Sequence, residues 1–130
     1  MLARFPVGDT QMCVAAEKVR GSFVSPHLAA APGAPPWIVG AYNRLGTAVA
    51  VIDAANFTGL NQDPSACTHI VLVETRSGEI GLAATGEPSE MEEPASLPGP
   101  GALLEVLDRE SDLLLLDVER LAEAVEEALV

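Results

Sequence analysis

The sequence predicts a mainly β protein of the small-barrel type that ends in one short helix. Short apolar segments follow one another with turn signals about every ten residues, a spacing typical of small β-barrels. The clearest helical periodicity lies at the C-terminal end. Apolar residues make up 48% of the 130-residue chain, which is enough to build the core of one domain.

The N-terminal segment predicts a β-hairpin. Leu2–Val7 has the composition of a strand, Gly8-Asp9 is a turn signal, and Gln11–Val19 is expected to be the returning strand. Residues 12–16 are apolar at successive positions, so both faces of this strand are apolar. Such a strand belongs in a closed or doubly covered sheet.

A proline-rich loop is expected next. Ser25–Pro36 contains four prolines, which lack a backbone donor and exclude a central strand or a helix interior. The only tryptophan, Trp37, is expected to anchor the end of this loop to the core. A short element over Trp37–Gly40, a turn over Asn43–Gly46 and a β-branched strand over Thr47–Asp53 follow.

The middle of the chain predicts a helical turn and a second hairpin. Ala54–Leu60 can form a short helical turn that ends at Gly59. His69–Thr75 and Glu79–Ala84 are strand-like segments on either side of Ser77-Gly78, a hairpin turn signal.

The C-terminal part predicts a loop, a hairpin and the helix. Glu87–Gly101 is rich in Pro, Gly, Glu and Ser and is expected to be a mobile acidic loop. Ala102–Leu107 and Leu113–Leu116 should pair as a hairpin, and Asp117 is a suitable N-cap for a helix over Val118–Leu129. The apolar face of that helix, at i, i+3 and i+4 spacing, consists of Val118, Leu121, Ala122, Val125 and Leu129.

The charge is distributed unevenly and argues against nucleic acid and membrane partners. The net charge is −12, yet residues 1–65 carry four acids and four bases, so residues 66–130 account for the whole excess. An acidic surface repels phosphate backbones and anionic bilayers. No apolar run approaches the roughly 18 residues that a membrane span requires, and the N-terminus lacks an apolar signal-peptide core. We therefore expect a cytoplasmic protein without membrane insertion.

Catalytic and metal-binding patterns are scarce. Cys13 and Cys67 are dispersed and are expected to be buried thiols in a reducing compartment. His27 and His69 are equally dispersed, and no motif places a nucleophile beside a base or forms a phosphate-binding glycine loop. The sequence therefore predicts no catalytic residue, no metal and no cofactor. A small hydrolase or metal protein is the alternative, and it requires a pocket where one of the histidines meets acidic residues.

The segment Pro35–Leu60 is the candidate for an interaction site. Glycines at 40 and 46 bracket Asn43, which tolerates left-handed backbone, so the segment predicts a tight turn before a buried strand. Arg44, one of seven bases, stands on this turn in the half of the chain whose net charge is zero. A rigid turn that displays an arginine is suited to contact with another protein.

This segment resembles the signature of CheW-like domains, which runs approximately P-x-[WF]-[IV]-x-G-x-x-N-[LV]-R-G before a strand rich in Val and Ile. The matching residues are Pro35, Trp37, Ile38, Gly40, Asn43, Gly46, Val49, Val51, Ile52, Asp53, Gly59 and Leu60. The resemblance continues over Ile70–Val73, Gly78–Leu82 and Leu113–Leu121. It departs from the family where Arg44 precedes Leu45, because the family has the apolar residue first. Ala50 also replaces the usual proline.

The resemblance implies two small five-stranded β-barrels packed together, with a short C-terminal α-helix. Residues 1–130 would form one domain of two lobes, and the second lobe would be shortened around residues 85–101. Members of the family couple chemoreceptors to a CheA-type histidine kinase and catalyse nothing. The kinase's regulatory domain docks barrel to barrel, and the receptor's cytoplasmic tip lies in a groove between the lobes. The partner-binding residues predicted on this basis are Asn43, Arg44, Leu45, Gly46, Val51 and Leu82. For Val51 and Leu82 the alternative is a place in the core.

Two functions remain open on this basis. The first is an adaptor that couples chemoreceptors to the kinase for chemotaxis or surface motility. The second is a CheW-like variant that binds the kinase or another partner without coupling to a receptor, because Arg44 and Leu45 are reversed and the second lobe is shortened.

Overall fold

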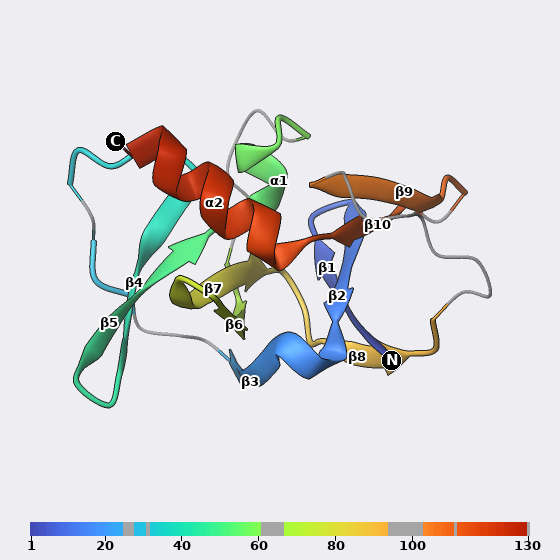
Figure 1. The fold of residues 1–130 in the computed structure, drawn as a ribbon, viewed down its shortest axis with the longest axis horizontal. Helices are drawn as coiled ribbons and strands as arrows, with labels where there is room; N and C mark the ends of the chain where they lie inside the picture. Colours follow the sequence, from blue (N-terminus) through green and yellow to red (C-terminus); the bar gives the residue numbers. More distant parts are fainter. Residues whose placement is uncertain (25–27, 31, 61–66, 94–102, 111, 130) are drawn as a thin grey trace.

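The chain forms two five-stranded β-sheets and a C-terminal helix (Figure 1). The computed structural model describes all residues except 25–27, 31, 61–66, 94–102, 111 and 130. The first sheet has the strand order β8-β1-β2-β10-β9, with β1 at Leu2–Val7, β2 at Thr10–Ala15, β8 at Ser89–Met91, β9 at Leu104–Asp108 and β10 at Leu113–Leu116. The second sheet has the order β3-β6-β7-β5-β4, with β3 at Val19–Val24, β4 at Ile38–Arg44, β5 at Thr47–Ile52, β6 at His69–Thr75 and β7 at Gly78–Ala84. The helical elements are the 3₁₀ turn η1 at Ala16–Lys18, α1 at Ala54–Phe57 and α2 at Val118–Leu129.

The predicted count of five strands in each unit is confirmed, but the sheets are not closed barrels. Closure requires the first and last strands of a sheet to pair. Among the described residues, β8 does not pair with β9 and β3 does not pair with β4. β8 is only three residues long, and its partner is β1.

The chain passes from one sheet to the other directly after β2. A single returning strand over Gln11–Val19 was expected, but β2 ends at Ala15 and the η1 turn leads into β3 of the second sheet. The reason is the register of the first hairpin, in which Ala15 pairs with Leu2 at the start of β1. Because β1 begins at Leu2, it has no further strand residue to pair with the chain after Ala15, and the chain leaves the first sheet there.

The expected acidic loop contains a strand in its described part. Ser89–Met91 pairs antiparallel with Leu2–Arg4 and forms the edge of the first sheet. The rest of the predicted loop, from residue 94, lies outside the described residues. The sequence Ser-Glu-Met carries no β signature, so the pairing follows from the open edge of β1 and not from local preference.

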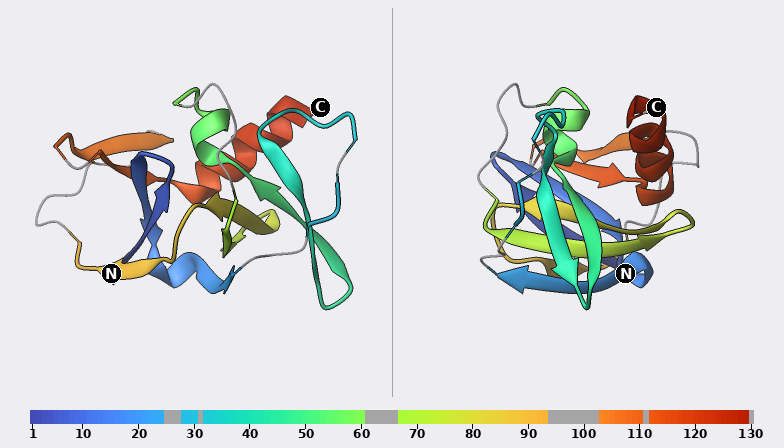
Figure 2. Two further views of the ribbon diagram at one scale, coloured as in Figure 1. Left: turned by 180° about the vertical axis from the view of Figure 1, so that it is seen from behind. Right: turned by 90° about the vertical axis from the view of Figure 1, so that its left-hand side faces the viewer.

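One hydrophobic core is shared by both sheets and by α2. The left view of Figure 2 shows the two sheets side by side, with α2 running from the end of β10 toward the second sheet. The core contains Phe5, Val7, Met12 and Val14 from the first sheet, Ile52, Val71, Val73, Leu82 and Ala84 from the second, and Val118, Leu121 and Val125 from α2. Because the two sheets bury the same cluster, we expect them to unfold as one unit.

The predicted helix is confirmed together with its cap. The Asp117 carboxylate accepts hydrogen bonds from the backbone N–H groups of Glu119, at 3.0 Å, and Arg120, at 3.2 Å. These contacts satisfy two of the amides that a helix leaves free in its first turn. The apolar face predicted from the i, i+3 and i+4 spacing is the buried face, except for the exposed Leu129.

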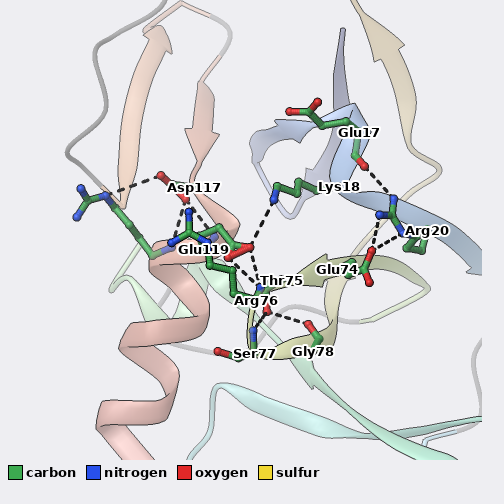
Figure 3. Close-up of polar contacts among 11 residues, drawn as sticks. Glu17, Lys18, Arg20, Glu74, Thr75, Arg76, Ser77, Gly78, Asp117 and Glu119 are labelled. Atoms are coloured by element: carbon green, nitrogen blue, oxygen red, sulfur yellow. Dashed lines mark hydrogen bonds and ion pairs between the residues drawn. The ribbon is translucent and has the colours of Figure 1, made fainter.

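A polar cluster joins the start of α2 to the second sheet and to η1 (Figure 3). The backbone N–H of Arg76, in the β6–β7 turn, donates to both carboxylate oxygens of Glu119 at 3.0 Å. The ammonium of Lys18 on η1 lies 3.5 Å from the same carboxylate. Glu119 therefore connects three elements that are far apart in the sequence.

The pKa of Glu119 makes this cluster testable by pH. The Arg76 backbone hydrogen bond, assisted by the charge of Lys18, lowers the pKa of the Glu119 carboxyl. A carboxyl whose pKa is lowered by folding stabilises the protein above its unfolded pKa, and this contribution is lost as the pH falls through its folded pKa. The stability difference between the wild type and Glu119→Gln should therefore be present at neutral pH and shrink below about pH 4. Urea unfolding of both proteins across this range measures it.

The control is Glu123→Gln, which changes an exposed residue of the same helix. Its stability should follow that of the wild type at every pH. If the Glu119→Gln difference were the same at pH 3 and pH 7, the carboxylate would not be the group that acts.

Candidate partner-binding hairpin

The segment singled out by the sequence forms a two-residue β-hairpin. β4 and β5 pair antiparallel from Ile38↔Ile52 to Arg44↔Thr47, with a bulge near the β4 start. The expected turn over Asn43–Gly46 is shorter than predicted. Asn43 and Arg44 are the last residues of β4, and only Leu45 and Gly46 form the turn.

The turn has the backbone of type I′. Both central residues have positive φ, 51° at Leu45 and 89° at Gly46. The Asn43 side-chain oxygen accepts a hydrogen bond from the Gly46 N–H at 3.0 Å and so closes the turn. A type I′ turn matches the twist of the two strands, which makes the hairpin stiff.

Arg44 is engaged within the protein. Its Nε lies 3.4 Å from Oε2 of Glu79 on β7, and both side chains are about one-third exposed. Nothing in the local sequence indicates this pair, because the residues are 35 positions apart. The side chain at the tip is Leu45, which is 96% exposed.

Aromatic contacts hold both ends of the hairpin. The rings of Trp37 and Phe57 meet edge to face with centroids 4.7 Å apart, and both pack against the shared core. This confirms Trp37 as the anchor of the preceding loop. Tyr42 lies against Phe23 of β3, with centroids 5.0 Å apart, on the other side of the second sheet.

Gly40 allows another part of the chain to cross β4 closely. Ala29 and Ala41 exchange two backbone hydrogen bonds, 2.9 and 3.0 Å long, beside it. A Cβ at position 40 would lie 2.7 Å from the Ala29 carbonyl oxygen and 3.0 Å from Cβ of Leu28. The covering segment also protects part of the β4 edge from pairing with other chains.

Two of the six predicted contact residues lie in the interior. Val51 and Leu82 are fully buried, Val51 against Ile70 and Ala83 and Leu82 in the shared core. With the sheet folded, neither side chain reaches the surface. Because β5 and β7 are paired here, with Ile52 opposite Leu82, these residues support the hairpin from inside.

A shallow hollow lies where the two sheets adjoin. It has a volume of about 270 Å³ and opens between β1, the η1 turn, the start of β3 and β8. Its lining is Ala3, Ala16, Val19, Pro88, Ser89 and Glu90.

The described residues bring together no metal-binding group. No cluster of three or more His, Cys, Asp or Glu side chains occurs in the part of the chain that the structure describes. His69 contacts the Thr68 hydroxyl at 2.8 Å, and His27 lies outside the described residues. Helices in the described part also fall short of the length and apolarity of a bilayer span.

Both cysteines are free thiols. Cys13 is fully buried as expected, and burial raises its pKa to about 11. Cys67 is only half-buried, and burial raises its pKa as well. The thiolate is the reactive form of cysteine, and a raised pKa keeps both thiols protonated at neutral pH. Neither cysteine therefore has the properties of a nucleophile.

Comparisons with known proteins identify one family and one similar fold. A family model described as the CheW-like domain matches residues 2–126. The crystal structure of the scaffolding protein TtCheW from Thermoanaerobacter tengcongensis is similar in fold, with a TM-score of 0.67 and 18% sequence identity, over 89% of this chain and 86% of that chain. No curated protein matches the sequence.

Proposed function

Because the chain belongs to the CheW-like domain family, whose members are non-enzymatic scaffold proteins, we propose that it is a cytoplasmic adaptor for chemotaxis or surface motility. It couples chemoreceptors to a CheA-type histidine kinase by binding both.

The observation that carries this proposal is the stiff β4–β5 hairpin. It projects from the second sheet, away from the first sheet (Figure 1). Arg44 is the only charged residue between Ile38 and Ile52, and it is paired with Glu79. The exposed side of the hairpin is therefore uncharged in a protein of net charge −12, which suits it for burial against another polypeptide.

We assign the kinase's regulatory domain to this hairpin, with contacts from Asn43, Arg44, Leu45 and Gly46. Val51 and Leu82 contribute by holding the strands in place. The receptor's cytoplasmic tip is assigned to the hollow beside η1, which lies at the junction of the two sheets as the family resemblance implies.

Binding to the two purified partners tests the proposal. The full chain is mixed with the cognate kinase regulatory domain, with the receptor's cytoplasmic tip, and with both, and complexes are measured by gel filtration and calorimetry. Separate binding of each partner and a complex of all three are expected. If the chain bound neither partner at micromolar concentrations, the assignment as an adaptor would be wrong.

A buried charge on the hairpin should weaken kinase binding. Ala48 is exposed on β5, opposite Asn43, so Ala48→Glu leaves the core intact. Burying its unpaired carboxylate in an interface should raise the Kd for the regulatory domain at least about tenfold. The matched control Ala128→Glu changes an exposed residue of α2 and should bind like the wild type. Equal Kd values for both variants would place the kinase elsewhere on the molecule.

A second candidate function is favoured by the ion pair between Arg44 and Glu79. In the family pattern the arginine comes second and would occupy the tip, whereas here the arginine is held one residue earlier. A chain whose arginine is held in this ion pair would bind the kinase without coupling it to a receptor. Binding of the regulatory domain together with no binding of the receptor tip would select this variant.

A further inference from the structure

Leucine at position 45 is unfavourable for the stability of the turn, because its side chain is exposed and its backbone is left-handed. Of the described large apolar side chains it is the most exposed, at 96%, ahead of Val24 at 69%. Its φ of 51° is also left-handed, a conformation that is unfavourable for residues other than Gly, Asn and Asp. Asparagine followed by glycine is the preferred pair for this turn type. The stability of the hairpin therefore does not account for a leucine here.

The only charged side chain of the hairpin is paired within the chain. Arg44 points to Glu79, and the Asn43 side chain closes the turn through the Gly46 N–H. Leu45 is left as the side chain that extends beyond the two strands.

The tip is held rigidly. Paired strands support it up to Arg44↔Thr47, and Figures 1 and 2 show the hairpin projecting clear of the rest of the chain. An apolar side chain that is already fixed loses little conformational entropy on binding, which is the property of an efficient anchor.

We propose that Leu45 is the specificity-determining anchor of the hairpin and inserts into an apolar pocket on the protein partner. This inference rests on the proposed function and names the chemistry of its contact. The net charge of −12 disfavours a second copy of this chain and an anionic membrane as the occupant. A protein pocket with a neutral or basic rim suits the charge of the chain.

The test compares Leu45→Ala and Leu45→Asn with the wild type, using the full chain and the kinase regulatory domain as probe. Both variants should raise the Kd about tenfold or more. Leu45→Asn creates the preferred turn pair, so its thermal unfolding midpoint should rise while its affinity falls. A merely structural role would move stability and affinity in the same direction.

Salt dependence identifies the contact as apolar. The ratio of the Leu45→Ala Kd to the wild-type Kd should be the same at low and high ionic strength, because salt screens charges and not apolar contacts. The double variant Arg44→Leu with Leu45→Arg moves the charge to the tip without changing composition, and it should bind as weakly as Leu45→Ala. Leu60→Ala, the same substitution at a 45% exposed site, is the matched control and should bind like the wild type.

The outcomes separate the two levels of the proposal. Wild-type binding with unchanged Kd in both Leu45 variants would overturn the anchor and leave the adaptor function standing. Stronger binding by the double variant would also overturn it, because the pocket would then select a cation. Absence of wild-type binding would reject the adaptor function and the anchor together. Concentration-dependent self-association that Leu45→Ala abolishes would make a second copy the occupant and overturn the partner proposed here.

Discussion

Replacing Leu121 by alanine should lower the free energy of unfolding by about 2–5 kcal/mol. Leu121 is fully buried on α2, in the cluster that also contains Phe5 from the first sheet and Val71 from the second. Truncation leaves a cavity at the place where three elements meet, and close packing allows it to collapse only in part. This is a large part of the roughly 5–15 kcal/mol that holds a typical domain together.

Two site-specific probes show whether the two sheets unfold in one transition. Fluorescence of Trp37 reports on the second sheet, and labelling of the buried Cys13 thiol reports on the first, in a Cys67→Ser background. The two urea transitions should share a midpoint in the wild type and shift together in Leu121→Ala. Leu129→Ala makes the same substitution at a 55% exposed position of α2 and should shift neither. Separate midpoints would mean that the sheets are independent units and that α2 does not join them.

Replacing Gly40 by alanine should destabilise the protein by about 1–3 kcal/mol, the usual range for overpacking. The added Cβ would meet the Ala29 carbonyl oxygen at 2.7 Å, and a backbone atom cannot move aside by changing a rotamer. Relief requires the segment around Ala29 to lift from β4, which breaks the two hydrogen bonds between Ala29 and Ala41. Thermal unfolding measures the loss, and faster amide exchange at Ala41 identifies its origin.

Gly21→Ala is the matched control for this prediction. Gly21 also lies in a strand, but a Cβ there would contact the Phe23 ring at an ordinary 3.5 Å. Since glycine is unfavourable within strands, this substitution should leave stability unchanged or raise it slightly. If both variants lost the same stability, the close crossing at Gly40 would not be the cause.

The same crossing gives a physical reason for the first glycine of the hairpin motif. The sequence indicated that Gly40 mattered for a turn, whereas the structure places it within β4 beneath another segment. What the position requires is the absence of a side chain, and its φ is not among the positive values. Gly46, in contrast, has φ 89° and serves the turn itself.

The sequence by itself determined the features that depend on near neighbours. The turn at Gly8, the hairpin of β6 and β7, the pairing of Leu104–Asp108 with Leu113–Leu116, and the Asp117 cap all follow from alternation, turn chemistry and capping. The predicted helix was right for the same reason, whereas the count of five strands in each unit came from the family resemblance. The family resemblance rests on such a local motif, and the match over residues 2–126 agrees with it.

Only the tertiary structure decided what lies against each element. The parallel pairing of β10 with β2, the short edge strand β8 and the open form of the sheets join segments that are distant in the chain. The ion pair of Arg44 with Glu79 was decided in the same way, and so was the choice between core and surface for Val51 and Leu82. The alternation of apolar and polar residues along a strand indicates which side of the strand a residue faces. It does not indicate whether that side contacts solvent or another part of the chain. That depends on packing between remote segments, which no local pattern encodes.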